Sequence, residues 1–262
     1  MMSKVQIVRV DVSSRKVSRI SDYVAEEKSL HVFLNKTHYA TIFCSPSNLK
    51  ELAIGHLLSQ GIIKKFSEIE KVDLNEEQTA CMVKLKQVVD VERMLRLSRN
   101  LSRVILSACG SQSPYQFTGR LPKIKSHLSL EAEIVLSCVD RLNSIAETFR
   151  KTGGVHAAAI YNKDGNVMAF AEDAGRHNAV DKVIGIAVLN ETDFGMCFLA
   201  LSGRLSGDIV LKVARVGLPI VASLAGPLTS GITMAKNANV TLIGFVRGKR
   251  MNIYTFPKRI CV

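Results

Sequence analysis

The feature that most constrains this chain is a regular alternation of short apolar runs with longer amphipathic stretches through its second half. The apolar runs have the length and β-branched content of buried strands, and the stretches between them have helical periodicity. Because parallel strands need long crossovers, the alternation predicts an α/β core, a mostly parallel sheet with helices on its faces. We expect strands at 196–202, 219–223 and 240–246, and helices at 177–190, 208–217 and 229–239.

The segment before this pattern reads as one long helix followed by a hairpin. Residues 130–152 are amphipathic, with Ser129 as the expected cap and Gly153 at the expected end. Two short strands at 157–161 and 167–172 flank a polar turn that contains a glycine, which is a hairpin signal. The helix and the hairpin extend the α/β core toward the N-terminus.

The first hundred residues have a different character, with short strands and one clear helix. That helix is expected at 49–60, with Asn48 as a candidate cap and Gly61 as its end. No linker-like stretch separates the two halves. We predict an α+β subdomain over 1–100 and an α/β domain over 101–262 that carries the functional site.

The net charge of +12 is unevenly placed along the chain. From Arg204 to Val262 there are nine Lys or Arg residues against one acidic residue, Asp208, which gives +8 in that stretch. A basic stretch of this kind favours an anionic partner. Nucleic acid and a phosphate-bearing small molecule both fit the charge, although few aromatic residues accompany the basic ones.

Cysteine spacing and hydropathy exclude several classes of protein. The six cysteines have no short spacing between any two, which is neither a zinc pattern nor a small disulfide framework. No apolar run approaches the roughly 18 residues that a membrane span needs, and the start of the sequence lacks the apolar stretch of a secretory signal. We therefore expect a cytoplasmic protein with reduced thiols that holds no metal through its own side chains.

Cys109 is the first candidate for chemistry. It follows an expected strand at 104–107, and Gly110 and Pro114 begin a long polar loop there. In an α/β sheet, reactive groups collect at the carboxyl ends of strands, and a thiolate in that place can attack or carry sulfur. An inert, buried cysteine is the alternative, and it is the better interpretation of the other five cysteines.

A block of polar and small residues from Thr152 to Gly185 is the second candidate. Its glycines give backbone freedom, and Arg176 and His177 stand at the start of an expected helix. Backbone amides at a helix start, with these side chains beside them, suit an anion such as phosphate. A capped helix with solvated charges accounts for the same residues equally well.

Two further loops combine glycine with basic residues. Arg204 lies between a buried strand and a helix, and Arg247, Lys249 and Arg250 lie in a turn between two expected strands. Both loops suit phosphate groups, but neither has the spacing of a P-loop or of a dinucleotide-binding fingerprint. A charged hairpin turn is the alternative for the second loop. Taken together, the loops predict a pocket for a ligand that carries several phosphates.

Four segments carry a family resemblance through their order and approximate spacing: GGVHAAAI (153–160), EDAGRHNAVDKVIG (172–185), LSGR (201–204) and GFVRGKRMNIYT (244–255). They resemble the FdhD family of formate dehydrogenase accessory proteins. The segment LKELAIGHLLSQGII (49–63) is also similar to that family. The likeness therefore covers most of the chain from about Leu49 onward.

The resemblance implies a cytidine-deaminase-like layered α/β core without the zinc site, joined to a smaller strand-rich N-terminal part. It also implies a sulfurtransferase that accepts sulfur from a cysteine desulfurase as a persulfide on Cys109. The sulfur passes to the molybdenum bis(molybdopterin guanine dinucleotide) cofactor, which formate dehydrogenase then receives. The family's cofactor-binding segment, with three basic residues from the neighbouring loops, gives the expected binding set: Phe245, Val246, Arg247, Gly248, Lys249, Arg250, Arg176, His177 and Arg204.

One position departs from the family pattern. The family usually shows Cys-Gly-x-Cys in the reactive loop, and here Gln112 stands in place of the second cysteine. One thiolate is enough to accept and donate sulfane sulfur. A chaperone that binds the cofactor for formate dehydrogenase without sulfur transfer is the alternative function. A nucleic-acid-binding protein is a third that rests on charge alone, and the oligomeric state stays open, with a homodimer as one option.

Overall fold

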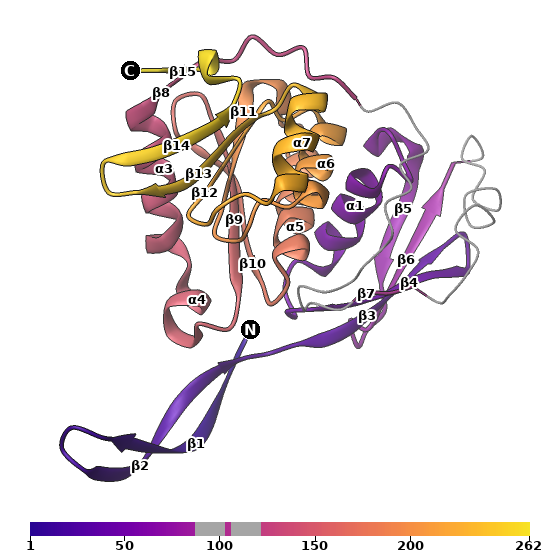
Figure 1. The fold of residues 1–262 in the computed structure, drawn as a ribbon. Coiled ribbons are helices and arrows are strands. Elements are labelled where there is room, and N and C mark those ends of the chain that lie inside the picture. The colour runs from indigo at the N-terminus through magenta and orange to yellow at the C-terminus, as the bar shows by residue number, and fades with distance from the viewer. Residues whose placement is uncertain (87–102, 106–121) are drawn as a thin grey trace.

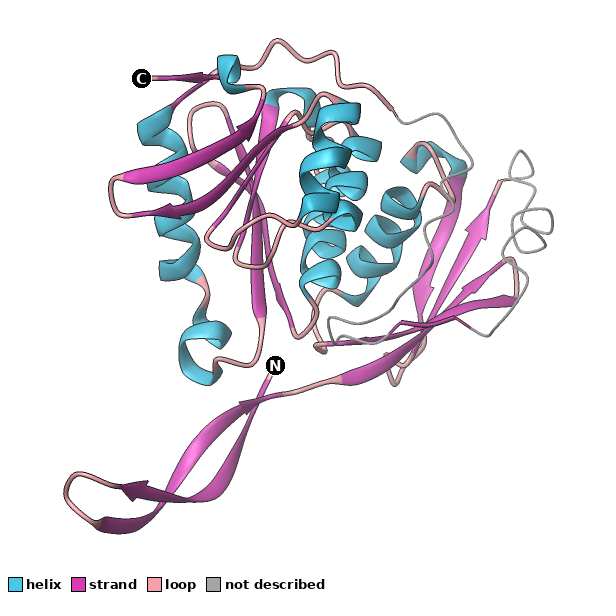
Figure 2. Cartoon of the chain, in the orientation of Figure 1, coloured by secondary structure: helices cyan, strands magenta, loops and turns pink. Residues whose placement is uncertain are grey.

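The computed structural model describes residues 1–86, 103–105 and 122–262. Figures 1 and 2 show a protruding arm, a five-stranded sheet, a layer of helices and a six-stranded sheet with further helices on its far face. The expected domain boundary at residue 100 lies outside the described residues, and so do Cys109 and Gln112. The division into two domains therefore stays a prediction.

The N-terminal arm is a two-stranded antiparallel ribbon formed by β1 (Met2–Asp11) and β2 (Lys16–Ala25). The strands pair along their whole length, and Figure 1 shows the ribbon projecting away from the rest of the molecule. The run of residues 5–12, rich in valine and isoleucine, predicts the first strand, whereas the sequence does not predict the second. In the second strand, Val17, Ile20 and Tyr23 are spaced by three rather than by two, so they form no alternating pattern.

The N-terminal sheet has the strand order β5-β6-β3-β4-β7. A turn at Asn35 and Lys36, both with positive φ, joins its two central antiparallel strands. The elements of this part are β3 (Lys28–Leu34), β4 (Thr37–Cys44), α1 (Leu49–Gln60), a 3₁₀ turn (Phe66–Glu68), β5 (Ile69–Leu74), β6 (Ala80–Leu85) and β7 (Arg103–Ile105).

Helix α1 ends as predicted but begins differently. Gly61 has φ 72° and its N–H bonds to carbonyls of the last turn, as a glycine end requires. Asn48 has φ 50° and its side chain makes no capping bond, so the expected cap is wrong. A capping side chain needs an extended backbone at that position to reach the free amides, and the left-handed conformation of Asn48 does not supply it.

The C-terminal sheet has the order β10-β9-β11-β12-β13-β14. Only β11–β12 and β12–β13 are parallel, so the expected mostly parallel sheet is in fact mixed. Hairpin turns at Gly165 and Gly248, both with positive φ, place antiparallel strands toward its two ends. The strands are β9 (His156–Asn162), β10 (Val167–Asp173), β11 (Cys197–Leu201), β12 (Ile220–Ser223), β13 (Thr241–Arg247) and β14 (Arg250–Thr255).

Helices cover both faces of this sheet. Figure 1 shows α3 (Ala132–Ile145) and α4 (Glu147–Thr152) on one side, and α5 (Arg176–Leu189), α6 (Gly207–Val216) and α7 (Thr229–Ala238) on the other. The remaining elements are β8 (Leu130–Glu131), which pairs with β15 (Ile260–Cys261), and 3₁₀ turns at Phe194–Met196 and Pro257–Arg259.

The single helix expected at 130–152 is divided. Its first two residues form a strand with the C-terminal segment, so the helix starts at Ala132 and Ser129 does not cap it. Ala146 has ψ 79°, which ends α3 before α4 begins. Gly153 ends the second piece with φ 63°, as predicted.

Successive side chains along the central strands point to opposite faces of the sheet and pack in two separate apolar cores. On β11, Phe198 and Ala200 belong to the core under α3, whereas Leu199 and Leu201 belong to the core under α5 and α6. The second of these cores continues without interruption into the five-stranded sheet. The mixed α/β class is confirmed, and the cytidine-deaminase-like layering stays a prediction. In the described part of the chain, no helix is long and apolar enough to cross a membrane.

Helices α1 and α5 join the two sheets through direct backbone contact. A Cβ on Gly55 would lie 1.8 Å from the carbonyl oxygen of Asp181, and a Cβ on Gly185 would lie 2.0 Å from that of Glu51. Only glycine permits helices to approach this closely. The close crossing brings the end of β4 against the start of α5.

Candidate functional site

Loops from both halves of the chain meet at one edge of the six-stranded sheet. The parallel strands β11, β12 and β13 all end there. The antiparallel strand β9 begins at the same edge, because Ala158 pairs with Leu201, and β10 ends beside it, because Asp173 pairs with His156. Ligands of α/β sheets bind at the carboxyl ends of strands, so this edge is the candidate site.

Arg176 is the most unusual residue at this edge. It is the first residue of α5 and is only 6% exposed, yet its Nε and Nη1 atoms have no hydrogen-bond partner. Its side-chain stem packs on Gly203, where a Cβ would lie 2.9 Å from the Cβ of Arg176. A buried guanidinium without an acceptor is costly, and free N–H groups at a helix start attract anions. The position is therefore suited to an anionic ligand.

His156 lies beside Arg176 and was not singled out from the sequence. Its Nδ1 is 3.3 Å from Oγ of Ser202, which also accepts a hydrogen bond of 3.0 Å from the N–H of Ala157. Burial lowers the pKa of His156, and the nearby charges of Arg176 and Arg204 lower it further. The imidazole is neutral at neutral pH. No local signal marks this residue, because only the antiparallel register of β9 brings it to the edge.

A buried ion pair fixes the loop that leads into α5. Nζ of Lys182 lies 2.7 Å from Oδ2 of Asp173, and both side chains are fully buried. The carboxylate also accepts from the backbone N–H of Gly175 and from the side-chain amide of Asn178. The N–H of Ser45, at the end of β4, donates to the same carboxylate at 3.0 Å. The N-terminal sheet therefore helps to position the start of α5.

His177 points toward a different neighbour from Arg176. Its Nε2 lies 3.9 Å from Oδ2 of Asp208 in the first turn of α6. Burial lowers the pKa of His177 to about 3, with Lys212 and then Arg176 as the next causes. The ring is thus a neutral group between two helix starts. Arg204 is exposed, and its charge acts on His156 from the loop after β11.

The β13–β14 turn adds the basic residues expected from the sequence. Phe245 has φ 53°, and its ring packs on Gly226, where a Cβ would lie 2.6 Å from it. The guanidinium carbon of Arg247 lies 5.6 Å from the centre of that ring. The turn continues with Gly248, Lys249 and Arg250, all exposed, whereas the side chain of Val246 is buried in the core with α3.

Backbone contacts join this turn to the loop that carries Arg204. The N–H of Leu205 donates to the carbonyl of Gly226, and Leu205 forms a parallel bridge with Pro227. Because Phe245 packs on Gly226, the loops after β11, β12 and β13 form one row. The structure thus brings Arg176, His177, Arg204 and Phe245 to one edge.

The expected sulfur carrier, Cys109, lies outside the described residues. Burial raises the pKa of Cys44 and Cys81 to about 12, and that of Cys138 and Cys197 to about 11. Thiols with such pKa values are unreactive at neutral pH. Among the cysteines in the described ranges, only Cys261 is exposed. In the same ranges, no cluster of three His, Cys, Asp or Glu side chains is arranged to hold a metal ion.

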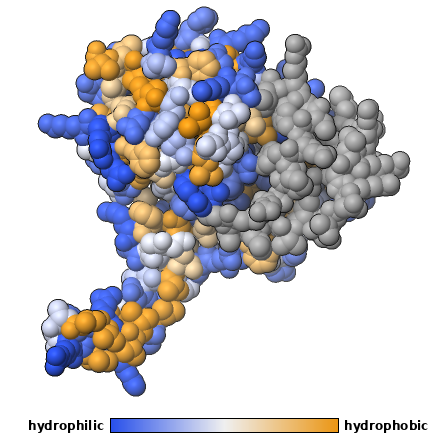
Figure 3. All heavy atoms as spheres, in the orientation of Figure 1, coloured by the Kyte–Doolittle hydropathy of each residue, from blue (hydrophilic) through white to orange (hydrophobic). Residues whose placement is uncertain are grey.

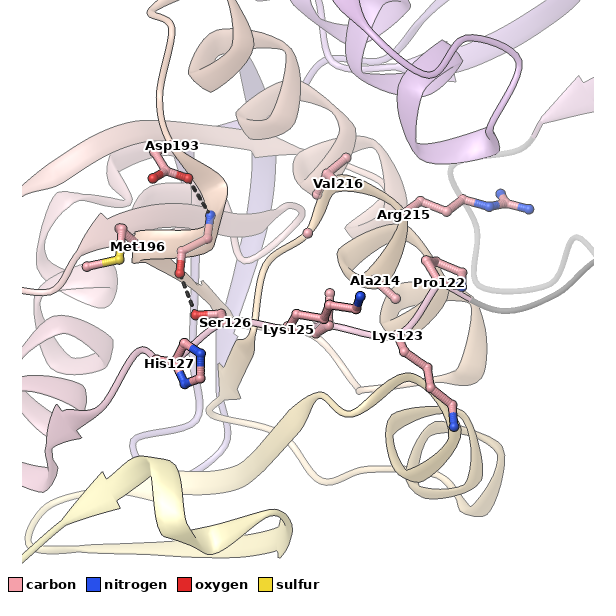
Figure 4. A pocket seen from close by; sticks show the side chains of 13 residues that line it. Pro122, Lys123, Lys125, Ser126, His127, Asp193, Met196, Ala214, Arg215 and Val216 are labelled. Carbon is pink, nitrogen blue, oxygen red and sulfur yellow. Dashed lines mark hydrogen bonds between the residues drawn. The ribbon is translucent and has the colours of Figure 1, made fainter.

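A hollow of about 540 Å³ lies at the opposite edge of the sheet, and Figure 4 shows its lining. One wall is the segment before β8, where Ser126 donates to the carbonyl of Gly195 at 2.6 Å. The other walls are the segment before β11 and the last turn of α6 with Gly217. Its lysines and Arg215 are spread around the rim, and none of its polar side chains is buried without a partner. This hollow is therefore a weaker candidate than the edge with Arg176.

A comparison with models of known protein families shows to which family the chain belongs. The model of the FdhD/NarQ family matches residues 25–261. The chain belongs to the FdhD/NarQ family. The match spans both sheets and every site residue discussed above, while most of the arm precedes it.

Individual relatives within the FdhD/NarQ family are similar over nearly the whole chain. The sulfur carrier protein FdhD of Sulfolobus acidocaldarius is 35% identical over 258 residues, covering 98% of each chain. The sulfur carrier protein FdhD of Shouchella clausii is 34% identical over 249 residues, covering 92% of this chain and 91% of the relative. The crystal structure of a protein described as a formate dehydrogenase accessory protein from Desulfotalea psychrophila superposes with a TM-score of 0.79, 26% identity and 99% coverage of both chains.

Proposed function

We propose that this chain is a cytoplasmic sulfurtransferase that serves formate dehydrogenase. Cys109 accepts sulfane sulfur from a cysteine desulfurase and delivers it to the molybdenum bis(molybdopterin guanine dinucleotide) cofactor, which is the cargo. The names of the relatives support the sulfur-carrying part of this proposal. The observation that carries the binding part is that Nε and Nη1 of Arg176, at the start of α5, are buried without a hydrogen-bond partner.

The edge residues fit an anionic dinucleotide cargo. Arg176 offers two free donors from a buried position, and the exposed turn offers Arg247, Lys249 and Arg250 for phosphate groups. Phe245 presents an aromatic ring beside Arg247, which suits contact with a flat base. His177 and Arg204 complete the proposed binding set, together with the backbone at Val246 and Gly248. The cofactor supplies the molybdenum that receives the sulfur, and the protein supplies binding and orientation.

The accepting step needs one thiol. The thiolate of Cys109 attacks the terminal sulfur of the desulfurase persulfide, a new S–S bond forms, and the desulfurase cysteine leaves as a thiolate with the electron pair of the broken bond. The step is redox-neutral, so Gln112 in place of a second cysteine does not prevent it.

Connectivity supports placing this thiol near the edge. Cys109 follows Ile105 by four residues, and four residues span at most roughly 14 Å. Ile105 ends β7 and pairs in parallel with Ile42 of β4. Two residues later β4 ends, and Ser45 donates to Asp173 at the candidate site. The chain therefore enters the segment with Cys109 close to that site.

A sulfur-loading experiment tests the proposal. The full chain is incubated with a cysteine desulfurase and cysteine, and modified peptides are mapped by mass spectrometry. We expect a mass gain of one sulfur on the Cys109 peptide, no gain there in Cys109→Ala, and normal loading of Cys109 in Cys261→Ala, which removes an exposed thiol. An unloaded Cys109 beside an active desulfurase would remove the transferase function.

The second candidate is a chaperone that binds the cofactor without moving sulfur, and Gln112 motivates it. Complementation separates the two functions. In a strain lacking this gene, Cys109→Ala should leave formate dehydrogenase inactive if sulfur transfer is essential. Full rescue by the same variant would favour the chaperone. A nucleic-acid-binding function would require tight binding to duplex or single strands at physiological salt, which a filter-binding assay measures.

A further inference from the structure

The arm, residues 2–25, is built as a surface for another molecule. Its ten residue pairs run from Met2–Ala25 to Asp11–Lys16, and neither outer edge pairs with a further strand in the described structure. None of its residues belongs to either apolar core. An isolated two-stranded ribbon is only marginally stable in water, so a ribbon of this length gains stability when something covers it.

One face near the tip of the arm is apolar. Val8, Val10, Val12 and Val17 are 59%, 60%, 85% and 66% exposed. Val10 is directly opposite Val17, and Val8 lies two residues from Val10, so these three side chains share a face, and Val12 follows them in the turn. We call the four residues the valine face. Figure 3 shows apolar residues gathered on the arm. A soluble protein rarely leaves such a patch uncovered unless it is an interaction site.

The base of the arm touches the rim of the candidate site. A Cβ on Gly154 would lie 3.1 Å from the Cβ of Ala25, and Nζ of Lys151 lies 5.8 Å from the ring centre of Tyr23. His156 follows Gly154 by only two residues. The base of the arm therefore adjoins the edge where cargo binds, and a protein that covers the whole arm reaches that edge.

Charge narrows the choice of partner. Residues 1–24 contain five basic residues (Lys4, Arg9, Arg15, Lys16 and Arg19) against Asp11 and Asp22, so 5 − 2 gives +3. The whole chain carries +12, so a second copy would bring like charge to the arm. An acidic surface would be attracted. The family model begins at residue 25, but the relative from Sulfolobus acidocaldarius covers 98% of this chain and the Desulfotalea psychrophila structure covers 99%, so these relatives share most of the arm.

We infer that the arm docks on an acidic surface of the formate dehydrogenase that takes the cargo, with the valine face against apolar side chains and a free edge along a strand of the enzyme. The inference rests on the proposed function, which supplies the client. Main-chain hydrogen bonds along the edge hold the arm in register, and the valine face adds apolar contact.

The test compares two full-length variants for binding to immobilised, cofactor-free formate dehydrogenase of the same organism. The first is the triple variant Val8→Thr, Val10→Thr, Val12→Thr, which keeps β-branched shape while removing apolar character. The control carries Val167→Thr and Val262→Thr, two exposed valines away from the arm. We expect at least tenfold weaker binding for the triple variant, no more than a twofold change for the control, and weaker wild-type binding at higher salt.

Three other results would each contradict a different part of the inference. Equal binding by the triple variant and the wild type overturns the arm inference and leaves the proposed function intact. Failure of the wild type to bind the enzyme, while Cys109 still loads sulfur, shows that the client is wrong and overturns the inference with it. A wild-type dimer in sedimentation that the triple variant abolishes, with enzyme binding unchanged, assigns the valine face to a second copy and also overturns it.

Discussion

Among the described residues, Arg176 is the strongest indication of function, because the structure shows that its side chain is buried at a cost to the stability of the fold. The free-energy penalty for burying a charged donor without an acceptor is larger than the net stabilisation that one ordinary hydrogen bond gives. Proteins keep such groups where a ligand supplies the acceptor. The stem of Arg176 is held by Gly203, so the guanidinium is positioned before any ligand arrives. This preorganisation favours a role in binding over a role in folding.

The first prediction separates those two roles. Arg176→Met keeps the packed stem and removes the charge. We expect guanosine diphosphate to bind about ten- to a hundredfold more weakly, since a charge-assisted hydrogen bond contributes roughly 1.5–3 kcal/mol. The free energy of unfolding should stay equal or rise, because an unpaired buried charge has been removed. Isothermal titration and urea denaturation measure the two quantities, with Arg150→Met as an exposed control. Undiminished binding, or a clear loss of stability, would contradict the assignment.

The second prediction concerns His177 and pH. Its pKa is lowered from 6.5 to about 3 in the folded protein, mainly by burial, so the unfolded chain takes up a proton at a higher pH than the folded one. Stability from the neutral ring is complete above pH 6.5 and falls as pH decreases toward 3. The slope for one proton is up to about 1.4 kcal/mol per pH unit.

Urea denaturation between pH 7 and pH 4 checks this expectation. His177→Gln removes the titrating ring, so its stability should fall less steeply than that of the wild type over this range. His156, whose pKa is also lowered, remains in both proteins and cancels in the comparison. Identical slopes would mean that His177 is not held neutral by the fold.

Sequence reasoning at the residue scale found the basic groups but not their surroundings. Arg176 and Arg204 could be predicted because a charge beside glycine at a helix start is a local pattern. His156 and Ser202 could not, because the strand register that joins them links residues 46 positions apart. The buried state of Arg176 was equally invisible, since it depends on the loop after β11. The assignment of Cys109 stays a prediction.

At the scale of elements, the crossing of α1 and α5 determines how the two sheets sit together. Gly55 and Gly185 let the helix backbones touch, and the contact places β4 against the loop before α5. Nearby, Asp181 accepts from Lys212 and Ser59 in a buried network between three helices. The network and the glycines together fix one packing arrangement.

The third prediction tests this crossing. Gly55→Ala places a Cβ 1.8 Å from a backbone oxygen, so the helices must separate. We expect a loss of about 3 kcal/mol or more in the free energy of unfolding, at the upper end of overpacking effects. Gly217→Ala is the matched comparison, because Gly217 has φ 89° and open space around it. Its loss should reach only about 1–2 kcal/mol, the cost of a left-handed backbone. Similar losses for both variants would show that steric contact is not the cause.

Elements were predictable where local periodicity sets them, and not where distant segments do. The ends of α1 and α4 follow from Gly61 and Gly153, whose positive φ values only glycine adopts readily. The strand at Leu130 depends on pairing with the C-terminal segment, more than a hundred residues away. No glycine or proline marks the break at Ala146 in the sequence. The mixed sheet arises from local hairpins toward its two ends and from the antiparallel pairing of β9 with β11, which the alternation of strand and helix does not predict.

For the whole molecule, one apolar core extends from the N-terminal sheet through α1 and α5 to the six-stranded sheet. The division into domains at residue 100 stays a prediction, as does a homodimer. The arm, by contrast, takes no part in this core. The arm shares no core residue with the body and touches it mainly near Ala25 and Tyr23. Folding of the body and recognition by the arm are therefore separable.

The fourth prediction uses this separation. Deleting residues 3–24 removes the ribbon but no buried apolar side chain of either core. We expect the midpoint of thermal unfolding to change by no more than about 2–4 °C, the shift that roughly 1 kcal/mol produces in a protein of this size. Sulfur loading of Cys109 and guanosine diphosphate binding should continue at wild-type levels, because the site residues lie in the body.

Activation of formate dehydrogenase should nevertheless fall sharply in the deletion variant, since delivery needs the docked client. Calorimetry, mass spectrometry and an enzyme activation assay measure the three effects on one protein sample. A body that unfolds many degrees lower would show that the arm stabilises the fold. Normal activation by a well-folded deletion variant would show that delivery needs no arm. Because the two failures appear in different measurements, the deletion tests the separation of folding from recognition directly.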